Sequence, residues 1–274
     1  MFYNQIMKNI PIIYILFVLI LTGCSRNIPT PNERLNTVLS LQGKDSFQKT
    51  IKTKNFELFS IQETTKECKN IKVYIEGDGL AWKTRTQISK DPTPINPSGL
   101  KLMNEDTSDC KIYIARPCQY TPYAKNCKNK YWTSHRFNKR VIDSYDEALN
   151  SIKKEYQNNT FSLIGYSGGG SVALLVATKR EDIKNITTIA GNINHSFWTK
   201  YHRINPLNGS QNPINYTKQL KKIPQYHLIG SNDTIIPKEI FNSYIQNFED
   251  SSNIHSKIYN ATHTKNGNKT IETF

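Results

Sequence analysis

The fold follows from one stretch of sequence, Thr160-Phe-Ser-Leu-Ile-Gly165-Tyr166-Ser167-Gly168-Gly169-Gly170-Ser-Val-Ala-Leu-Leu-Val-Ala177-Thr178. An apolar run, a serine among glycines and an alanine-rich run follow one another, which predicts a strand, a sharp turn and a helix. A serine at such a turn has strained backbone geometry and an exposed hydroxyl. Glycines flank it because a Cβ there would collide with the adjoining strand or helix. Ser167 is therefore a candidate nucleophile; a flexible loop or a phosphate-binding loop is the alternative.

Predicted strands and helices alternate along the rest of the chain. The strands are expected at 71–76, 111–115, 160–165, 186–190, 225–230 and 255–259, and the helices at 137–156, 169–178 and 238–248. Two further runs of alternating hydrophobicity, 47–53 and 56–62, predict an antiparallel hairpin at one sheet edge. Strands that alternate with helices favour right-handed crossovers. We therefore expect an α/β fold with a mostly parallel sheet of about eight strands and helices on both faces.

The N-terminal segment has the features of an export signal. Lys8 precedes an uncharged, mostly apolar run that ends in Leu21-Thr22-Gly23-Cys24. This run is short for a membrane span, and small residues precede the cysteine. It resembles the lipobox of bacterial lipoproteins, in which the signal peptide is removed and the new N-terminal cysteine is acylated. We expect residues 1–23 to be the signal peptide and Cys24 to be lipidated, with an uncleaved membrane anchor as the alternative.

The same resemblance implies a location and a domain plan. Residues 24–36 are rich in proline and polar residues and predict a tether between the membrane and a single domain at 37–274. In lipoproteins of bacteria with two membranes, a residue other than aspartate after the cysteine favours the outer membrane. Ser25 therefore implies, in such a host, a protein that faces the periplasm from the outer membrane.

The chain is basic, with 36 Lys and Arg against 22 Asp and Glu. The charge is spread without a dominant block, which fits anionic surroundings such as a lipid or cell-wall surface and equally fits a compositional bias of the genome. Zinc-finger spacing, RNA-binding signatures and compact basic blocks are missing from the sequence, so nucleic acid is not an expected partner.

Four cysteines remain beside Cys24, and an even number in an exported chain predicts disulfides. Cys68 and Cys110 each lie just before a predicted strand, so they lie side by side if those strands are parallel neighbours. Cys118 and Cys127 then close a short loop. Paired C-x-x-C spacing is lacking, and no metal site is expected.

Three residues with complementary chemistry come directly after predicted strands. These are Ser167, Asp233 and His263, and the carboxyl ends of parallel strands gather the loops of an active site. Histidine can take the proton of a serine hydroxyl, and aspartate can orient the imidazole. Only His263 among the six histidines follows the last strand. Asp233 has a second interpretation, an Asx turn that opens the helix near Pro237.

The order Ser, Asp, His and the elbow Gly165-Tyr166-Ser167-Gly168-Gly169 resemble the α/β-hydrolase superfamily over about residues 47–265. The resemblance implies a catalytic triad of Ser167, Asp233 and His263 without a metal or organic cofactor. It also implies an oxyanion hole made by the backbone N–H of Gly168 and one N–H from the turn after the strand 71–76.

For the second donor we expect the Asp78 N–H, with Gly79 as the alternative. The turn Glu76-Gly77-Asp78-Gly79 departs from the better-known pattern, because Glu76 stands where many esterases and lipases carry a histidine. Stretches at 74–82, 91–94 and 115–120 resemble uncharacterised α/β-hydrolase lipoproteins of bacteria.

Aromatic and basic residues near the expected site have two interpretations each. The aromatic residues Tyr120, Tyr123, Tyr131, Trp132, Phe197, Trp198 and Tyr201 either line a substrate pocket or cap the core. Arg116, Arg136 and Arg203 either bind a substrate anion or, as we expect for each, lie on the solvated surface. Between Asn192 and Ile223 there is room only for a small lid.

Together these features predict a monomeric, lipid-anchored serine hydrolase that cleaves a small-molecule or lipid ester, or a thioester, through an acyl-enzyme. An amidase or peptidase would use the same triad. A binding lipoprotein without catalytic activity is the alternative from a different functional class, since a fold does not guarantee an activity.

Overall fold

The computed structural model describes residues 28–264, in which strands and helices alternate as the sequence predicts. The strands are β1 (Phe47–Lys52), β2 (Glu57–Glu63), β3 (Asn70–Ile75), β4 (Lys111–Ile114), β5 (Thr160–Tyr166), β6 (Ile183–Ile189), β7 (Gln225–Gly230) and β8 (Ile254–Tyr259). The helices are α2 (Pro31–Ser40), α3 (Ser98–Glu105), α4 (Lys139–Tyr156), α5 (Gly168–Ala177), α6 (His195–Tyr201), α7 (Thr217–Leu220) and α8 (Lys238–Ile245), with 3-10 turns η1 (Asn129–Trp132) and η2 (Pro213–Tyr216).

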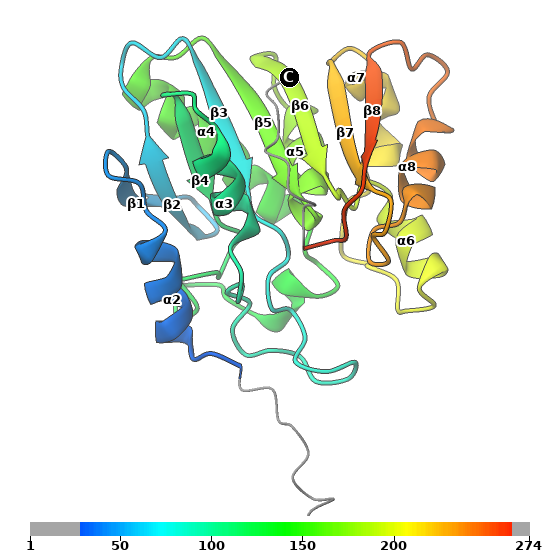
Figure 1. The fold of residues 1–274 in the computed structure, drawn as a ribbon, viewed down its shortest axis with the longest axis horizontal. Helices are drawn as coiled ribbons and strands as arrows, with labels where there is room; N and C mark the ends of the chain where they lie inside the picture. Colours follow the sequence, from blue (N-terminus) through cyan, green and yellow to red (C-terminus); the bar gives the residue numbers. More distant parts are fainter. Residues whose placement is uncertain (1–27, 265–274) are drawn as a thin grey trace, which may run out of the picture. The chain divides into compact units, whose positions relative to one another are not determined.

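The eight strands form one sheet in the order β1-β2-β4-β3-β5-β6-β7-β8 (Figure 1). Strand β2 runs antiparallel to both β1 and β4, and all pairs from β4 to β8 are parallel. Val73 in β3 lies opposite Ile112 on one side and Leu163 on the other. The predicted α/β fold, with an antiparallel hairpin at one edge of a mostly parallel sheet, is confirmed.

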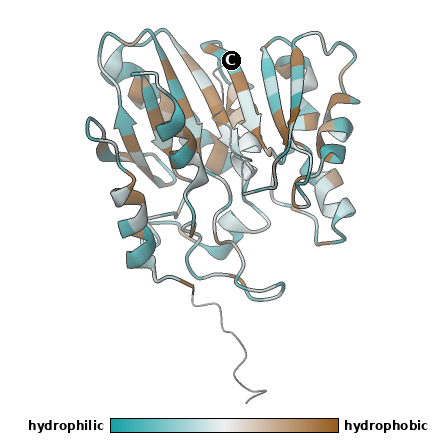
Figure 2. Ribbon diagram, viewed as in Figure 1, coloured by the Kyte–Doolittle hydropathy of each residue, from teal (hydrophilic) through white to brown (hydrophobic). Residues whose placement is uncertain are grey.

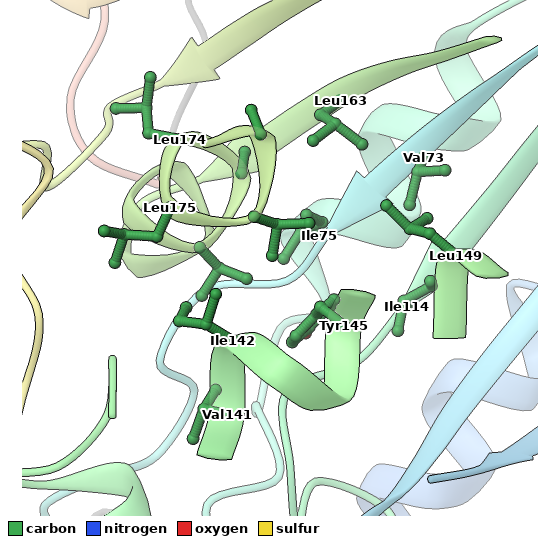
Figure 3. Packing of buried hydrophobic residues seen from close by; sticks show 14 of the residues in the cluster. Val73, Ile75, Ile114, Val141, Ile142, Tyr145, Leu149, Leu163, Leu174 and Leu175 are labelled. Atoms are coloured by element: carbon green, nitrogen blue, oxygen red, sulfur yellow. The ribbon is translucent and has the colours of Figure 1, made fainter. Parts of the chain in front are cut away.

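The main core lies between the sheet and helices α4, α5 and α8. Figure 3 shows Ile75 and Leu163 of the sheet in one apolar cluster with Tyr145 of α4 and Leu174 of α5. All ten residues of α5 are buried, which explains its unbroken apolar sequence. Figure 2 shows hydrophobic residues with hydrophilic ones among them along the strands; β5 is buried from Phe161 to Gly165, whereas the first residues of β3 and β6 are partly exposed.

The opposite face is covered by α3, a helix that the sequence analysis did not predict. Leu100 and Met103 of α3 are fully buried in a second core cluster with Tyr74 and Tyr113. The helix has only eight residues and contains Gly99, so its local preference for helix is weak. Packing against the sheet therefore stabilises it, rather than its own sequence.

The folded unit begins at Pro31, earlier than the boundary expected near residue 37. Arg34 in the first turns of α2 is buried, and its guanidinium forms a 3.0 Å ion pair with Asp91. It also donates a hydrogen bond to the Thr93 carbonyl. These long-range contacts hold a segment whose proline and polar residues resemble a tether when only the sequence is considered.

No helix within residues 28–264 is long and apolar enough to span a bilayer. The expected signal peptide, 1–23, and the expected lipidation site, Cys24, lie outside the described residues.

Both predicted disulfides are present. Cys68 and Cys110 are joined across the parallel neighbours β3 and β4, with their Cα atoms 5.8 Å apart. Cys118 and Cys127 close the short loop after β4. The first bond covalently links two adjacent strands at the amino-terminal edge of the sheet.

We expect the two disulfides to differ in their contribution to stability. Loop-closure entropy in the unfolded chain gives about 4 kcal/mol for the bond with a sequence separation of 42 and about 2.5 kcal/mol for the bond with a separation of 9. Urea denaturation of Cys68→Ser/Cys110→Ser and of Cys118→Ser/Cys127→Ser measures both losses. A larger loss for the second variant would contradict this expectation.

Candidate active site

Ser167 lies at the sharp turn between β5 and α5. Its backbone has φ +51° and ψ −118°, a conformation that is strained for a residue with a side chain. The glycines on either side have no room for a Cβ: one on Gly165 would lie 2.4 Å from the Gly169 carbonyl oxygen, and one on Gly169 would lie 2.3 Å from the Ile75 carbonyl oxygen. The close approach of strand and helix therefore explains the glycines of the elbow.

The structure brings Ser167, His263 and Asp233 together in one chain of hydrogen bonds. His263 Nε2 lies 3.0 Å from Ser167 Oγ, and His263 Nδ1 lies 2.8 Å from Asp233 Oδ2. An ionised carboxylate only accepts hydrogen bonds, so Nδ1 carries a proton in this arrangement. Nε2 of the neutral imidazole is then the acceptor for the serine hydroxyl, which is the arrangement that a general base requires.

The Asp233 side chain is completely buried and makes the contacts that both interpretations of the sequence require. While Oδ2 faces His263, Oδ1 accepts hydrogen bonds of 2.8 Å from the N–H groups of Ile235 and Ile236. This Asx-type turn fixes the carboxylate before α8 begins. The local turn and the contact with His263 therefore reinforce each other.

The loops around His263 are held by contacts that sequence reasoning missed. Tyr166 donates a 2.6 Å hydrogen bond from its hydroxyl to the His263 carbonyl, with the two rings 5.4 Å apart. Trp198 Nε1 donates to the Ile235 carbonyl at 2.9 Å, which ties α6 to the loop of Asp233. Tyr166 occupies a variable position of the elbow pattern, and no sequence signal marks its hydroxyl.

The turn after β3 lies directly beside the elbow. A Cβ on Gly77 would lie 3.3 Å from Ser167 Cβ, and one on Gly168 would lie 2.3 Å from Asp78 Oδ1. Gly79 has a φ of +64° and faces the Pro92 carbonyl, so the turn requires glycine there. The two expected oxyanion donors, Gly168 and Asp78, thus flank the nucleophile on adjoining segments.

The Asp78 carboxylate is held by two arginines. Arg136 Nη1 lies 2.6 Å from Oδ2 and Arg116 Nη1 lies 3.1 Å from Oδ1. Burial by itself would raise the pKa of the carboxyl, but the charges and hydrogen bonds of both guanidinium groups outweigh it and hold the pKa below its usual value. Gln119 Nε2 further supports the turn through a 2.9 Å hydrogen bond to the Gly77 carbonyl.

The expected surface location is wrong for Arg116 and Arg136, which are 4% and 6% exposed. Arg203 is exposed, as expected. A sequence cannot show this difference, because the burial of an arginine depends on a carboxylate that is distant in the chain, here Asp78.

Glu76, at the position where many esterases and lipases carry a histidine, is buried among hydrogen-bond donors of the protein. It is 1% exposed and accepts hydrogen bonds from the N–H groups of Gly77 and Gly99 and from the Tyr113 hydroxyl. Burial raises its pKa to about 7, even though these hydrogen bonds and the charge of Arg116 act in the opposite direction. Glu76 thus links the turn after β3 to α3.

An open cavity of about 550 Å³ leads to Ser167 and His263. Its volume is within the usual range for small-molecule sites. Trp198 lines the cavity, whereas Tyr131 and Trp132 are buried in the core and Tyr123 is almost fully exposed. Trp198 therefore fits the pocket interpretation and Tyr131 and Trp132 fit the core interpretation, whereas Tyr123 fits neither. Within residues 28–264, no three His, Cys, Asp or Glu side chains gather as metal ligands would.

Comparisons with known proteins agree with this fold. A model of the family described as serine hydrolase FSH1 matches residues 83–264. A search of curated protein sequences gives no match.

Solved structures with a similar fold include the esterase Pf2001 of Pyrococcus furiosus, with a TM-score of 0.55 and 15% identity over 86% of each chain. Naproxen esterase of Bacillus subtilis has a TM-score of 0.54 and 13% identity over 88% of this chain and 92% of its own. The acylaminoacyl peptidase of Pyrococcus horikoshii has a TM-score of 0.53 and 11% identity over 83% of this chain and 39% of its own. At these identities the likeness shows a shared fold.

We expect Gly169→Ala to cost about 1–3 kcal/mol of stability and to lower the turnover number, because the new Cβ would collide with the Ile75 carbonyl and move the elbow. Gly43→Ala is the matched control, since its Cβ would meet only ordinary contacts at 3.5 Å or more. Urea denaturation and assays of turnover compare the two. Equal effects would refute the steric explanation of the elbow.

We expect Glu76→Gln to change how stability depends on pH. The pKa of this carboxyl is about 7 in the folded protein against an ordinary 4.5, so the folded state binds its proton more tightly. The resulting stabilisation is complete below pH about 4.5 and is lost as the pH rises to about 7, by at most about 1.4 kcal/mol per pH unit.

Glutamine does not titrate, so the variant lacks this loss. The free energy of unfolding of Glu76→Gln minus that of the wild type should therefore increase across this pH range and then stay constant. Urea denaturation at a series of pH values measures the difference, which also cancels the titration of other groups. A difference that does not vary with pH would show that Glu76 is not protonated on folding.

Proposed function

The chain belongs to the FSH1 serine hydrolase family, and from this we propose that it cleaves a carboxylic ester or thioester through a triad of Ser167, His263 and Asp233. The observation that carries the proposal is the continuous hydrogen-bond chain from Asp233 through His263 to Ser167 at the end of the cavity. The ester activity in the names of several proteins of similar fold supports the choice of substrate class.

In the first half of the reaction, Ser167 Oγ attacks the carbonyl carbon of the substrate and its proton passes to His263 Nε2. The carbon–oxygen double bond becomes a single bond, and its oxygen takes the negative charge. The leaving alcohol or thiol then departs with the proton from His263, which leaves an acyl group on Ser167. Asp233 stabilises the imidazolium through Nδ1–H without accepting its proton.

In the second half, water attacks the acyl carbon while His263 takes one of its protons. The second tetrahedral intermediate collapses to the carboxylic acid, and the proton returns to Ser167 Oγ. The N–H groups of Gly168 and Asp78 are the proposed donors to the oxyanion in both halves.

The arginine pair at Asp78 has a clear electrostatic consequence for these steps. The Asp78 carboxylate lies against Gly168, where an unpaired negative charge would oppose a developing oxyanion. Arg116 and Arg136 bring two positive charges to this one carboxylate. The pair therefore makes an acidic residue compatible with an oxyanion hole.

The lipobox-like segment supports a further part of the proposal, attachment to the cell-envelope membrane through an acylated Cys24. On the same basis, we propose that in a host with two membranes the protein is attached to the outer membrane and faces the periplasm. Mass spectrometry of the mature N-terminus tests for a diacylglyceryl group on this cysteine.

We expect a fluorophosphonate probe to label the wild-type protein and not Ser167→Ala, since the probe forms a covalent bond to an activated serine Oγ with loss of fluoride. Asp233→Asn should lower the turnover number of p-nitrophenyl ester hydrolysis by about 10⁴, because the imidazole then adopts the wrong tautomer. The matched control is Asp143→Asn, on the outer surface of α4 and paired with Lys139, which should keep full activity.

Labelling of Ser167→Ala, or its absence in folded wild-type protein, would overturn the nucleophile assignment. A peptide hydrolysed faster than every ester would favour a peptidase. Ligand binding and cellular function that survive in Ser167→Ala would favour a binding protein without catalytic activity.

A further inference from the structure

The active site lies at the carboxyl ends of the parallel strands, and the charged residues there have an unusual distribution. We refer to this side of the sheet as its active-site edge. We call the loops after the parallel strands, at 76–98, 115–138, 190–216, 231–237 and 260–264, the mouth loops. Figure 1 shows them along one edge of the sheet. Their acidic residues, Glu76, Asp78, Asp91 and Asp233, are buried or paired with arginine.

The basic residues of the mouth loops are arranged in the opposite way. Lys83, Arg85 and Lys90 are exposed after β3, and Lys200 and Arg203 are exposed after β6. Three further exposed lysines follow β4. The mouth loops therefore present positive charge to the surroundings without an exposed acidic residue.

The opposite side of the sheet, at the amino ends of the parallel strands, exposes residues of both charges. Exposed acidic residues such as Glu67 and Asp109 lie there before β3 and β4, close to exposed Lys66 and Lys69. The general basic composition of the chain does not explain this contrast, because it would affect both edges alike.

Large apolar side chains lie on the same edge as the exposed bases. Trp82, Ile95 and Ile235, which we call the rim, are 41%, 45% and 49% exposed. All three line the cavity that contains Ser167 and His263; Trp82 and Ile95 come from the loop after β3 and Ile235 from the loop after β7.

Two of the three rim residues, Trp82 and Ile235, are held in place by contacts within the fold. Trp82 forms an antiparallel bridge with Ile88, and Lys83 and Gln87 share a backbone hydrogen bond of 2.8 Å. The carbonyl of Ile235 accepts hydrogen bonds from Trp198 and lies 2.9 Å from His202 Nε2. An exposed tryptophan and isoleucines among basic residues are typical of surfaces that insert into the headgroup region of a bilayer.

The start of the folded unit lies on the same side. Helix α2 begins at Pro31, and its Arg34 is paired with Asp91, close in the chain to the rim residue Ile95. From the proposed lipidated Cys24 to Pro31 a chain can extend at most about 25 Å, at about 3.6 Å per residue. A lipid on Cys24 would therefore keep this edge of the domain near the bilayer.

We propose that the mouth loops and the rim dock on an anionic lipid bilayer, and that the active site takes its ester substrate from that bilayer. This inference rests on the proposed function and the proposed lipidation. The rim enters the headgroup region while Lys83, Arg85, Lys90, Lys200 and Arg203 face anionic lipids, each contributing about fivefold to membrane affinity. An acyl chain can then pass from the bilayer along the rim to Ser167.

The docking itself is measured by quenching of tryptophan fluorescence. Full-length lipoprotein with Ser167→Ala is inserted in vesicles of phosphatidylcholine and phosphatidylglycerol that contain a lipid with a spin label near its headgroup. We expect the Ser167→Ala/Trp82→Phe variant to lose most of this quenching, because Trp132 is buried in the core and Trp198 is only partly exposed. Equal quenching with and without Trp82 would overturn the proposed docking.

The consequence for activity is measured with charge reversal at matched sites. Lys83→Glu/Arg85→Glu should lower the hydrolysis of an ester embedded in these vesicles at least about fivefold and leave the hydrolysis of a soluble short ester unchanged. The control, Lys66→Glu/Lys69→Glu, makes the same change in charge at the opposite edge and should alter neither rate.

The docking proposal would be overturned if both double variants lost the same hydrolysis rate on the vesicle-embedded ester. It would also be overturned if Lys83→Glu/Arg85→Glu slowed hydrolysis of the soluble ester as much as that of the embedded ester. Failure of the wild-type protein to hydrolyse any soluble ester would instead count against the proposed function. The quenching experiment uses an inactive variant, so it decides on docking independently of that outcome.

Discussion

The active site depends on one close steric contact, the approach of the first turn of α5 to the end of β3. There is no space for a side chain on Gly169, because its Cβ would lie 2.3 Å from the Ile75 carbonyl oxygen. This contact forces Ser167 into its strained turn and brings the segment from Glu76 to Gly79 beside it. The strain is tolerated because α5 is completely buried in the main core, where packing outweighs its cost.

Buried charge is the second constraint on this edge of the sheet. Asp78 is tolerated there because two arginines pair with its carboxylate, and Glu76 because burial raises its pKa and three donors surround its oxygens. One carboxylate oxygen of Asp233 accepts a hydrogen bond within a local turn, and the other lies against His263. Each acid thus has its partner within the protein, so the positive charge of the surrounding loops is left to face outward.

Most of the fold could be predicted from the sequence because its signals are local. The period of hydrophobic residues marked all eight strands and the long helix α4, and the positions of Cys68 and Cys110 before two strands predicted their disulfide. Helices α2, α3, α6 and α7 were not predicted. The first two depend on distant partners: Arg34 on Asp91, and Leu100 and Met103 on the far face of the sheet. Local preference alone does not specify such helices.

The sequence by itself determined the α/β fold, the elbow around Ser167 and the order in which serine, aspartate and histidine follow their strands. Only the tertiary structure decided that these side chains meet within hydrogen-bond distance, that Arg116 and Arg136 are buried against Asp78, and that the exposed bases and the rim share one edge. The physical reason is the distance along the chain over which each kind of interaction acts. Periodicity and turn chemistry act over a few residues, whereas burial and ion pairing depend on groups that only the packing of the sheet brings together.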